Sequence, residues 1–416
     1  MSAKPSRSSR RPARKGCLTG EVRASRMDDA ACPEGPDEGG MLDFEPSFGD
    51  FTVEERVEKQ FRAFVEEREQ AGEELVGPRL GRVIRLDRGY PLVETAEGPC
   101  RAEHAISLVK DRFRDFRAAV GDWVVLDTPE GHDKAVIETV LARATELSRW
   151  DGGTWGARQV LAANVDTMLV AQPLSKRDLV CDRLVRSVVL ARQGGIAPCV
   201  LLTKADRCGG EERLGAIMAQ VRSAVGQGVP VVALSVPEGR GVEEVRRLIE
   251  PGRCAILLGE SGAGKSTLVN ALVGAEVLGV GEVRGRDDQG RHTTVARRMV
   301  KVPDAGVLVD APGLRSLPLL DEEAGLARTF PEIDELVGGC RFRDCTHGNE
   351  PGCAVQDGVR EGAVDPDRLE EYRMLVSEML NNRRGLDPAA KASLTKYRRT
   401  YGAVWRYMSE LFITLV

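Results

Sequence analysis

The most informative segment of the chain reads Gly259-Glu260-Ser261-Gly262-Ala263-Gly264-Lys265-Ser266. It directly follows the apolar run 254–258 and opens a segment whose apolar residues recur at helical spacing. A G-x-x-x-x-G-K-S sequence between a strand and a helix is the signature of a phosphate-binding loop, or P-loop. Its glycines let successive backbone N–H groups wrap a phosphate at the helix N-terminus. We therefore predict a nucleotide site, the alternative being a chance match in a loop.

The residues around the P-loop alternate between strand and helix patterns. Short apolar runs typical of buried strands fall at 165–172, 197–203, 229–235, 254–259 and 306–310. Helical patterns separate them at 180–192, 211–225, 242–250 and 265–273. Such alternation predicts an α/β domain with a parallel sheet and helices on its faces.

Two further strand ends carry residues that suit a nucleotide base. One strand ends in Thr203-Lys204-Ala205-Asp206, and Ser235 follows the next strand. Here the chain resembles a GTPase, in which the aspartate of an N-K-x-D loop accepts hydrogen bonds from guanine that adenine cannot supply. Asp206 and Lys204 match that loop, while Thr203 stands where asparagine is commonest. Ser235 matches the loop that supports the base; a helix-capping turn is the alternative reading of the tetrapeptide.

Phosphate and Mg²⁺ ligands are expected from the P-loop and from two later segments. Lys265 reaches the β and γ oxygens in such sites, and the hydroxyl of Ser266 ligates Mg²⁺. Asp310 opens a D-x-x-G, and residues 290–294 read Gly-Arg-His-Thr-Thr at the position of switch I. The predicted Mg²⁺ ligands are Ser266, Thr293, Thr294 and Asp310. The predicted nucleotide-binding residues are Thr203, Lys204, Asp206, Ser235, Gly259, Glu260, Ser261, Gly262, Ala263, Gly264, Lys265, Ser266, Thr267, Asp310 and Gly313.

The order of these motifs is unusual. An ordinary GTPase runs from the P-loop through switch I and D-x-x-G to N-K-x-D, whereas here 203–206 and Ser235 precede the P-loop. We infer a circular permutation, which keeps every strand in place and connects switch II directly to the segment that follows it. All these motifs end strands of one sheet, where open α/β sheets bind ligands.

A metal-ligand pattern follows the D-x-x-G. Cys340-x4-Cys345-x-His347-x5-Cys353 gathers three thiolates and one imidazole within fourteen residues. This is a closed tetrahedral zinc set with no position left for water, so we predict one structural Zn²⁺. The alternatives are a catalytic metal or free cysteines.

The remaining segments suggest a multidomain chain. Residues 1–52 read as a disordered arm, 53–75 as an amphipathic helix and linker, and 76–147 as five short strands that predict a small OB-like barrel. The GTPase domain is placed at 148–330, and a zinc-binding, helical C-terminal domain at 331–416. The barrel either binds nucleic acid through Arg101, Arg112, Arg114 and Arg117 or merely spaces the domains.

Composition restricts the classes of protein. The chain has 416 residues, 30% of them charged, and a net charge of −5. No apolar run approaches the ~20 residues that span a bilayer, and the basic start lacks the apolar core of a secretory signal. We therefore expect a cytoplasmic protein with no membrane association and no disulfides, an organelle transit peptide in the arm being the alternative. Basic residues gather at 1–20 and 381–408, where they could meet a polyanion.

The barrel, the permuted GTPase motifs and the C-x4-C-x-H-x5-C cluster, in that order, resemble the ribosome small-subunit-dependent GTPase A family over about residues 76–400. The resemblance implies a factor that binds the small ribosomal subunit and its rRNA late in maturation, hydrolyses GTP there and leaves. We expect a monomer that binds GTP and GDP.

The residue after D-x-x-G is Leu314, which cannot position the attacking water as glutamine does in many GTPases. His292 in switch I is the candidate catalytic residue, the alternative being a surface histidine without a role. Two other functions stay open: a P-loop ATPase or kinase, and an RNA-binding assembly scaffold with little turnover.

Overall fold

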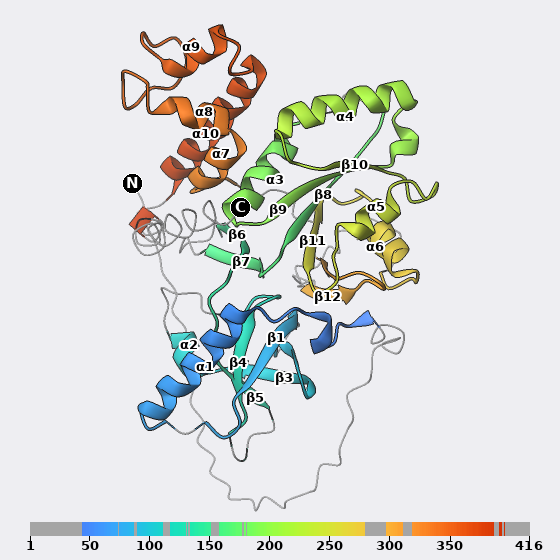
Figure 1. Ribbon diagram of the computed structural model, residues 1–416, viewed down its shortest axis with the longest axis vertical. Helices are drawn as coiled ribbons and strands as arrows, with labels where there is room; N and C mark the ends of the chain where they lie inside the picture. Colours follow the sequence, from blue (N-terminus) through green and yellow to red (C-terminus); the bar gives the residue numbers. More distant parts are fainter. Residues whose placement is uncertain are drawn as a thin grey trace, which may run out of the picture. The chain divides into compact units, whose positions relative to one another are not determined.

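The computed structural model describes residues 44–386, 391, 392 and 395, without the gaps 74, 87–89, 111–116, 130, 132–133, 151–157, 177–178, 180, 279–296 and 311–317 (Figure 1). Its strands fall into one 11-stranded sheet, which includes the barrel, and a separate two-stranded hairpin.

The first five strands form a closed barrel. They are β1 (Arg79–Leu86), β2 (Leu92–Thr95), β3 (Gly98–His104), β4 (Trp123–Asp127) and β5 (Ala135–Val140). Their order is β1-β2-β3-β5-β4, and β4 pairs back onto β1. This confirms the predicted barrel, whose interior holds Val83, Val93, Val124, Leu126 and Ile137. Within the segment 76–147, where the sequence predicted strands alone, β3 stops at His104 and the short helix α2 (Ile106–Lys110) follows it.

Residues 44–52 differ from the sequence prediction, which placed them at the end of a disordered arm. Phe51 is buried and forms a bridge with Gly252, and the ring of Phe48 meets Trp123 edge-on at 5.9 Å. A short 3-10 helix, Phe48–Asp50, precedes the amphipathic helix α1 (Glu55–Gln70). The aromatic side chains supply the apolar surface that the rest of the arm lacks.

The central sheet holds the nucleotide motifs. Its strands are β8 (Thr167–Pro173), β9 (Ala197–Thr203), β10 (Val231–Leu234), β11 (Cys254–Gly259), β12 (Arg297–Lys301) and β13 (Val307–Asp310). They lie in the order β10-β9-β8-β11-β13-β12, and all pairs are parallel except β12–β13. The hairpin of β6 (Glu146–Trp150) and β7 (Arg158–Ala163) precedes this sheet in the chain.

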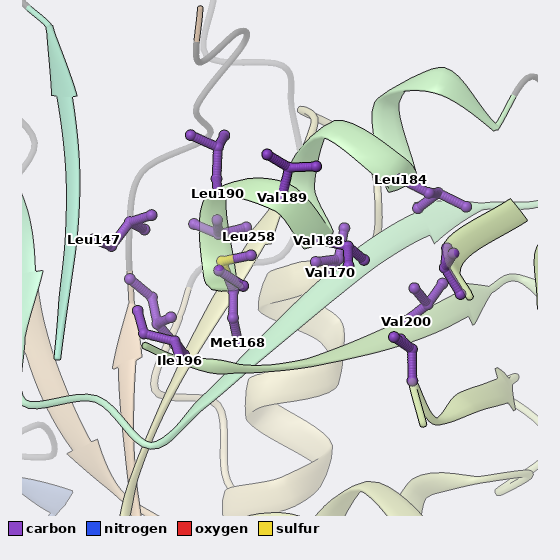
Figure 2. Packing of buried hydrophobic residues seen from close by; sticks show 14 of the residues in the cluster. Leu147, Met168, Val170, Leu184, Val188, Val189, Leu190, Ile196, Val200 and Leu258 are labelled. Carbon is purple, nitrogen blue, oxygen red and sulfur yellow. The ribbon is translucent and has the colours of Figure 1, made fainter. Parts of the chain in front are cut away.

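Helices cover both faces of this sheet: α3 (Asp182–Gln193), α4 (Glu211–Val225), α5 (Val242–Arg247) and α6 (Lys265–Val273). Alternate residues of β8 point to opposite faces, as a strand requires. Met168 and Val170 share a core with α3 and α4, whereas Leu169 and Ala171 share one with α5 and α6. Figure 2 shows the first of these cores, where α3 residues such as Leu184 and Val188 pack over the strands.

The barrel and the central sheet are joined at one seam. Strand β1 pairs antiparallel with β12, through Arg85 and Arg298. Arg82 of β1 is buried, its guanidinium lies 4.6 Å from the Trp123 ring centroid, and it donates a 2.9 Å hydrogen bond to the Asn164 carbonyl. Strand β12, which follows the predicted switch I segment in the sequence, is therefore hydrogen-bonded to the barrel.

The C-terminal region is helical: α7 (Glu323–Thr329), α8 (Pro331–Val337), α9 (Ala354–Arg360) and α10 (Pro366–Gly385). Helix α10 begins after Asp365, whose carboxylate caps the N–H of Asp367 at 2.8 Å, and has Pro366 in its first turn. Residues 387–416, the last part of the predicted helical C-terminal domain, lie almost entirely outside the described residues. No helix in the described part of the chain has the length and apolarity to cross a membrane.

Candidate nucleotide site and metal centre

The P-loop connects β11 to α6 with a tight backbone path. A Cβ atom on Gly259 would lie 2.7 Å from the carbonyl oxygen of Ala171 on β8, so only glycine fits there. Gly264 has a positive φ of 87° and is the N-cap of α6. These two glycines allow the chain to leave the sheet and enter the helix within a few residues.

Lys265 lies across this loop. Its Nζ donates hydrogen bonds to the carbonyl oxygens of Gly259 at 2.7 Å and Glu260 at 3.0 Å. Burial lowers the pKa of Lys265, and the charge of Asp310 acts in the opposite direction. The ammonium group is thus half-buried near Asp310, the last residue of β13, which pairs with Leu257 of β11.

Thr203 ties the end of β9 to the P-loop. Its hydroxyl donates a 2.7 Å hydrogen bond to the carbonyl of Ala263, and both residues are buried. The sequence had placed Thr203 where asparagine is commonest, leaving this contact open. The hydroxyl makes a direct link between the two loops.

Asp206 is held by the next strand end. The buried Ser235 hydroxyl donates to Asp206 Oδ1 at 2.9 Å. Arg207 lies 3.6 Å from the other carboxylate oxygen in an exposed ion pair. Lys204 has a positive φ of 57°, an uncommon backbone conformation for lysine that turns the chain sharply after β9. The structure therefore brings Thr203, Asp206 and Ser235 to one sheet edge.

The predicted Mg²⁺ and catalytic residues are only partly described. Ser266 lies in the first turn of α6, and Asp310 ends β13. His292, Thr293, Thr294 and Gly313 lie outside the described residues, as does Leu314.

The four predicted metal ligands meet in the loop before α9. Their ligand atoms all lie within 4.8 Å of one another, in Cys340, Cys345, His347 and Cys353. The Nδ1 atom of His347 is 3.6 Å from the sulfurs of Cys340 and Cys353, and those sulfurs are 3.9 Å apart. In a tetrahedral zinc site with Zn–S bonds of ~2.3 Å, the ligand atoms lie at similar distances from one another. The cluster fits a zinc ion.

Hydrogen bonds brace this loop from inside. The carboxylate of Glu350 accepts from the backbone N–H groups of Thr346 at 2.9 Å and Gly348 at 2.8 Å. The side chain of Gln356 donates to the His347 carbonyl at 2.7 Å. Burial lowers the pKa of His347, which favours the neutral imidazole that binds metals.

The fold and the site define a circularly permuted P-loop GTPase that carries a Cys3His cluster after its switch II segment. A family model described as RsgA GTPase matches residues 140–320. A "Small ribosomal subunit biogenesis GTPase RsgA" of Streptomyces coelicolor is 40% identical over 330 residues, which is 79% of this chain and 88% of that protein. The chain belongs to the RsgA GTPase family and is a GTP hydrolase.

Other relatives and solved structures agree. The RsgA protein of Xylella fastidiosa strain 9a5c is 40% identical, covering 73% of this chain and 86% of that protein. YjeQ from Thermotoga maritima has a TM-score of 0.55 at 26% identity, covering 73% of this chain and 99% of its own. YloQ, described as a circularly permuted GTPase, has a TM-score of 0.54 at 20% identity, with 74% and 97% covered, and shares the fold.

Besides the hydrogen bond from Thr203 to Ala263, sequence reasoning missed an ion pair in the P-loop. The side chain of Glu260 forms an ion pair with Arg183 at the start of α3. The two residues are far apart in the sequence and no motif relates them, so no pattern could have predicted the pair.

Proposed function

We propose that this GTPase binds the small ribosomal subunit in the cytoplasm, hydrolyses GTP there late in the subunit's maturation, and then leaves. The observation that carries the proposal is the 40% identity to the S. coelicolor RsgA protein over 79% of the chain. The seam between the barrel and β12 supports it, because a particle bound at the barrel would act on the strand that follows switch I.

Guanine recognition is assigned to the loop after β9. Asp206 accepts two hydrogen bonds from the base, Ser235 fixes the rotamer of that carboxylate, and the stem of Lys204 covers the ring. The remaining nucleotide contacts are assigned to the P-loop residues 259–267 and to Asp310 and Gly313. Arg207 has to release the second Asp206 oxygen when guanine binds, which its exposure allows.

The chemistry of hydrolysis is assigned to groups around the γ-phosphate. Mg²⁺ would be held by Ser266, by Thr293 or Thr294, and through water by Asp310, where it would neutralise developing negative charge. His292 is proposed to act on the attacking water when switch I becomes ordered on the particle. His292→Ala should then keep GTP and particle binding and lose most of the stimulated rate; stimulation at the wild-type rate would remove His292 from the mechanism.

The Cys3His cluster is assigned a structural zinc ion. Cys340, Cys345, His347 and Cys353 would hold it with no site open to water, so its contribution is to the fold of the loop.

RNA binding is assigned to the barrel, the zinc module and the basic C-terminal segment. Of the barrel arginines named from sequence, Arg101 donates to the Tyr90 carbonyl at 2.9 Å, whereas Arg112 and Arg114 lie outside the described residues. Phosphate contacts release counterions, so binding should weaken steeply between ~50 and 200 mM salt. Binding that is independent of salt would point to a ribosomal protein as the contact instead.

Co-sedimentation with purified small subunits tests the proposal. The full chain should pellet with the subunits in a non-hydrolysable GTP analogue and much less in GDP. Equal recovery in both nucleotides, together with no stimulation of hydrolysis, would favour an assembly scaffold over a GTP-driven release cycle.

A further inference from the structure

Arg183 connects helix α3 to the P-loop. Its guanidinium pairs with the carboxylate of Glu260, and each side chain is 44% exposed. The backbone carbonyl of Glu260 also accepts a hydrogen bond from Lys265 at 3.0 Å. One P-loop residue is thus held by two cations, one on its main chain and the other on its side chain.

Helix α3 presents Arg183 from a fixed position. A Cβ atom on Gly325 of α7 would lie 2.3 Å from the Val189 carbonyl, so the two helices touch through their backbones. The Gly325 N–H also donates to Gln193 at 2.8 Å. One turn after Arg183, Arg186 pairs with Glu378 of α10. Contacts to α7 and α10 therefore fix the position of helix α3, from which the side chain of Arg183 reaches Glu260.

The charge of Glu260 presents a problem for a nucleotide site. A carboxylate on the loop that wraps the phosphates repels a polyanion, and this repulsion grows with the number of phosphates. A neighbouring guanidinium cancels most of that field at short range. The ion pair leaves the P-loop with the positive charge of Lys265 as its main local field.

We propose that Arg183 is a positioning residue of the nucleotide site that acts through Glu260, holding and neutralising its carboxylate so that the P-loop accepts a triphosphate. The inference rests on the assignment of GTP to this loop. It gives Arg183 no contact with the nucleotide.

A double-mutant cycle read by equilibrium titration with GTP, GDP and GMP tests this inference. Arg183→Ala should weaken GTP binding about tenfold, GDP binding less and GMP binding least, because the unpaired Glu260 repels each phosphate charge. In a Glu260→Gln background the same Arg183→Ala change should have a clearly smaller effect, since no carboxylate is then left to be held and neutralised. Arg183→Lys should retain most of the affinity for GTP.

Three outcomes would overturn the inference. Equal losses for all three nucleotides would indicate a general structural defect. An undiminished loss in the Glu260→Gln background would indicate that Arg183 acts on the nucleotide itself, by contact or by its own charge, and not through Glu260. Wild-type affinity for GTP in Arg183→Ala would show that the ion pair has no role. Arg222→Ala, an exposed arginine on α4, is the matched control and should bind like wild type. Wild-type protein that fails to bind GTP would instead refute the nucleotide assignment itself.

Discussion

The nucleotide edge and the Cys3His loop are built in opposite ways. The nucleotide edge gathers residues from β9, β10, β11 and β13, whose strands are fixed by two hydrophobic cores. The Cys3His loop takes all four ligands from residues 340–353, between two short helices, α8 and α9. Long-range packing shapes the first site before any ligand arrives, whereas the second has little apolar surface of its own.

The two sites therefore obtain their stability from different contacts. At the nucleotide edge the packing of the sheet fixes the backbone, and buried hydrogen bonds such as the one from Thr203 to Ala263 add to its stability. The Cys3His loop relies on Glu350, Gln356 and its metal ligands. Removing a metal ligand should therefore unfold the Cys3His loop. Removing one hydrogen bond at the nucleotide edge should only lower its stability.

Zinc removal should give the largest effect. Cys345→Ser, or chelation of the metal, should disorder residues 335–360 and leave GTP binding intact, because structural zinc contributes roughly 10–16 kcal/mol of apparent binding free energy to local folding. Hydrogen exchange across this segment and elemental analysis are the measurements, with Cys100→Ser in the barrel as the control. Protein that lacks stoichiometric zinc and still protects this segment would contradict the assignment.

Asp206→Asn should have the next largest effect. Two hydrogen bonds from guanine to a charged acceptor contribute ~1.5–3 kcal/mol each, so GTP affinity should fall by about a hundredfold or more. Xanthosine triphosphate should gain affinity, since its base offers the complementary pattern. Titration with both nucleotides checks this result, and Arg207→Ala should retain GTP binding. Unchanged GTP affinity in Asp206→Asn would mean that Asp206 does not bind the base.

Thr203→Val should have a smaller effect, which is a loss of unfolding free energy. The substitution keeps the shape but leaves the buried Ala263 carbonyl without its donor, which costs about 1–3 kcal/mol of unfolding free energy. Thr203→Ser keeps the hydroxyl and should behave like wild type. Urea denaturation compares the two variants, and equal stability would show that the tether between the loops contributes nothing.

Glu371 should make the attachment of α10 depend weakly on pH. Burial raises its pKa from an ordinary value of 4.5 to about 7, with Arg368 opposing the shift and Asp182 adding to it. Because the folded form holds this proton more tightly, stability should fall as pH rises from about 4.5 to 7 and stay lower above that range. Thermal unfolding from pH 5 to 8 should show a smaller fall in Glu371→Gln than in the exposed control Glu370→Gln. Identical slopes would contradict the buried-carboxyl account.

Most of the fold could be predicted from the sequence, because its motifs lie at the ends of helices and strands. Helices α4 and α6 begin and end at the predicted residues, where glycines flank them. Strand β12 escaped prediction, because its charged sequence becomes a strand through pairing with β1 and β13. The segment around Phe48 also escaped it, since its aromatic contacts reach a distant barrel strand.

The sites, too, were predictable only where their residues lie close together in the sequence. The spacing of Cys340 to Cys353 predicted a cluster that the structure brings together, because all four ligands are close in sequence. The Thr203 tether and the pair of Arg183 with Glu260 join residues more than fifty positions apart, and no spacing rule relates such pairs.

Single-turnover hydrolysis of GTP by the full chain, with and without small ribosomal subunits, tests whether the subunit stimulates this GTPase. We expect slow turnover by the free protein, since Leu314 cannot orient the water, and a large stimulation on the subunit that depends on geometry more than on GTP affinity. Large ribosomal subunits at the same concentration serve as the control and should stimulate much less. An identical rate with and without small subunits, under conditions where the protein binds both GTP and the particle, would contradict the account.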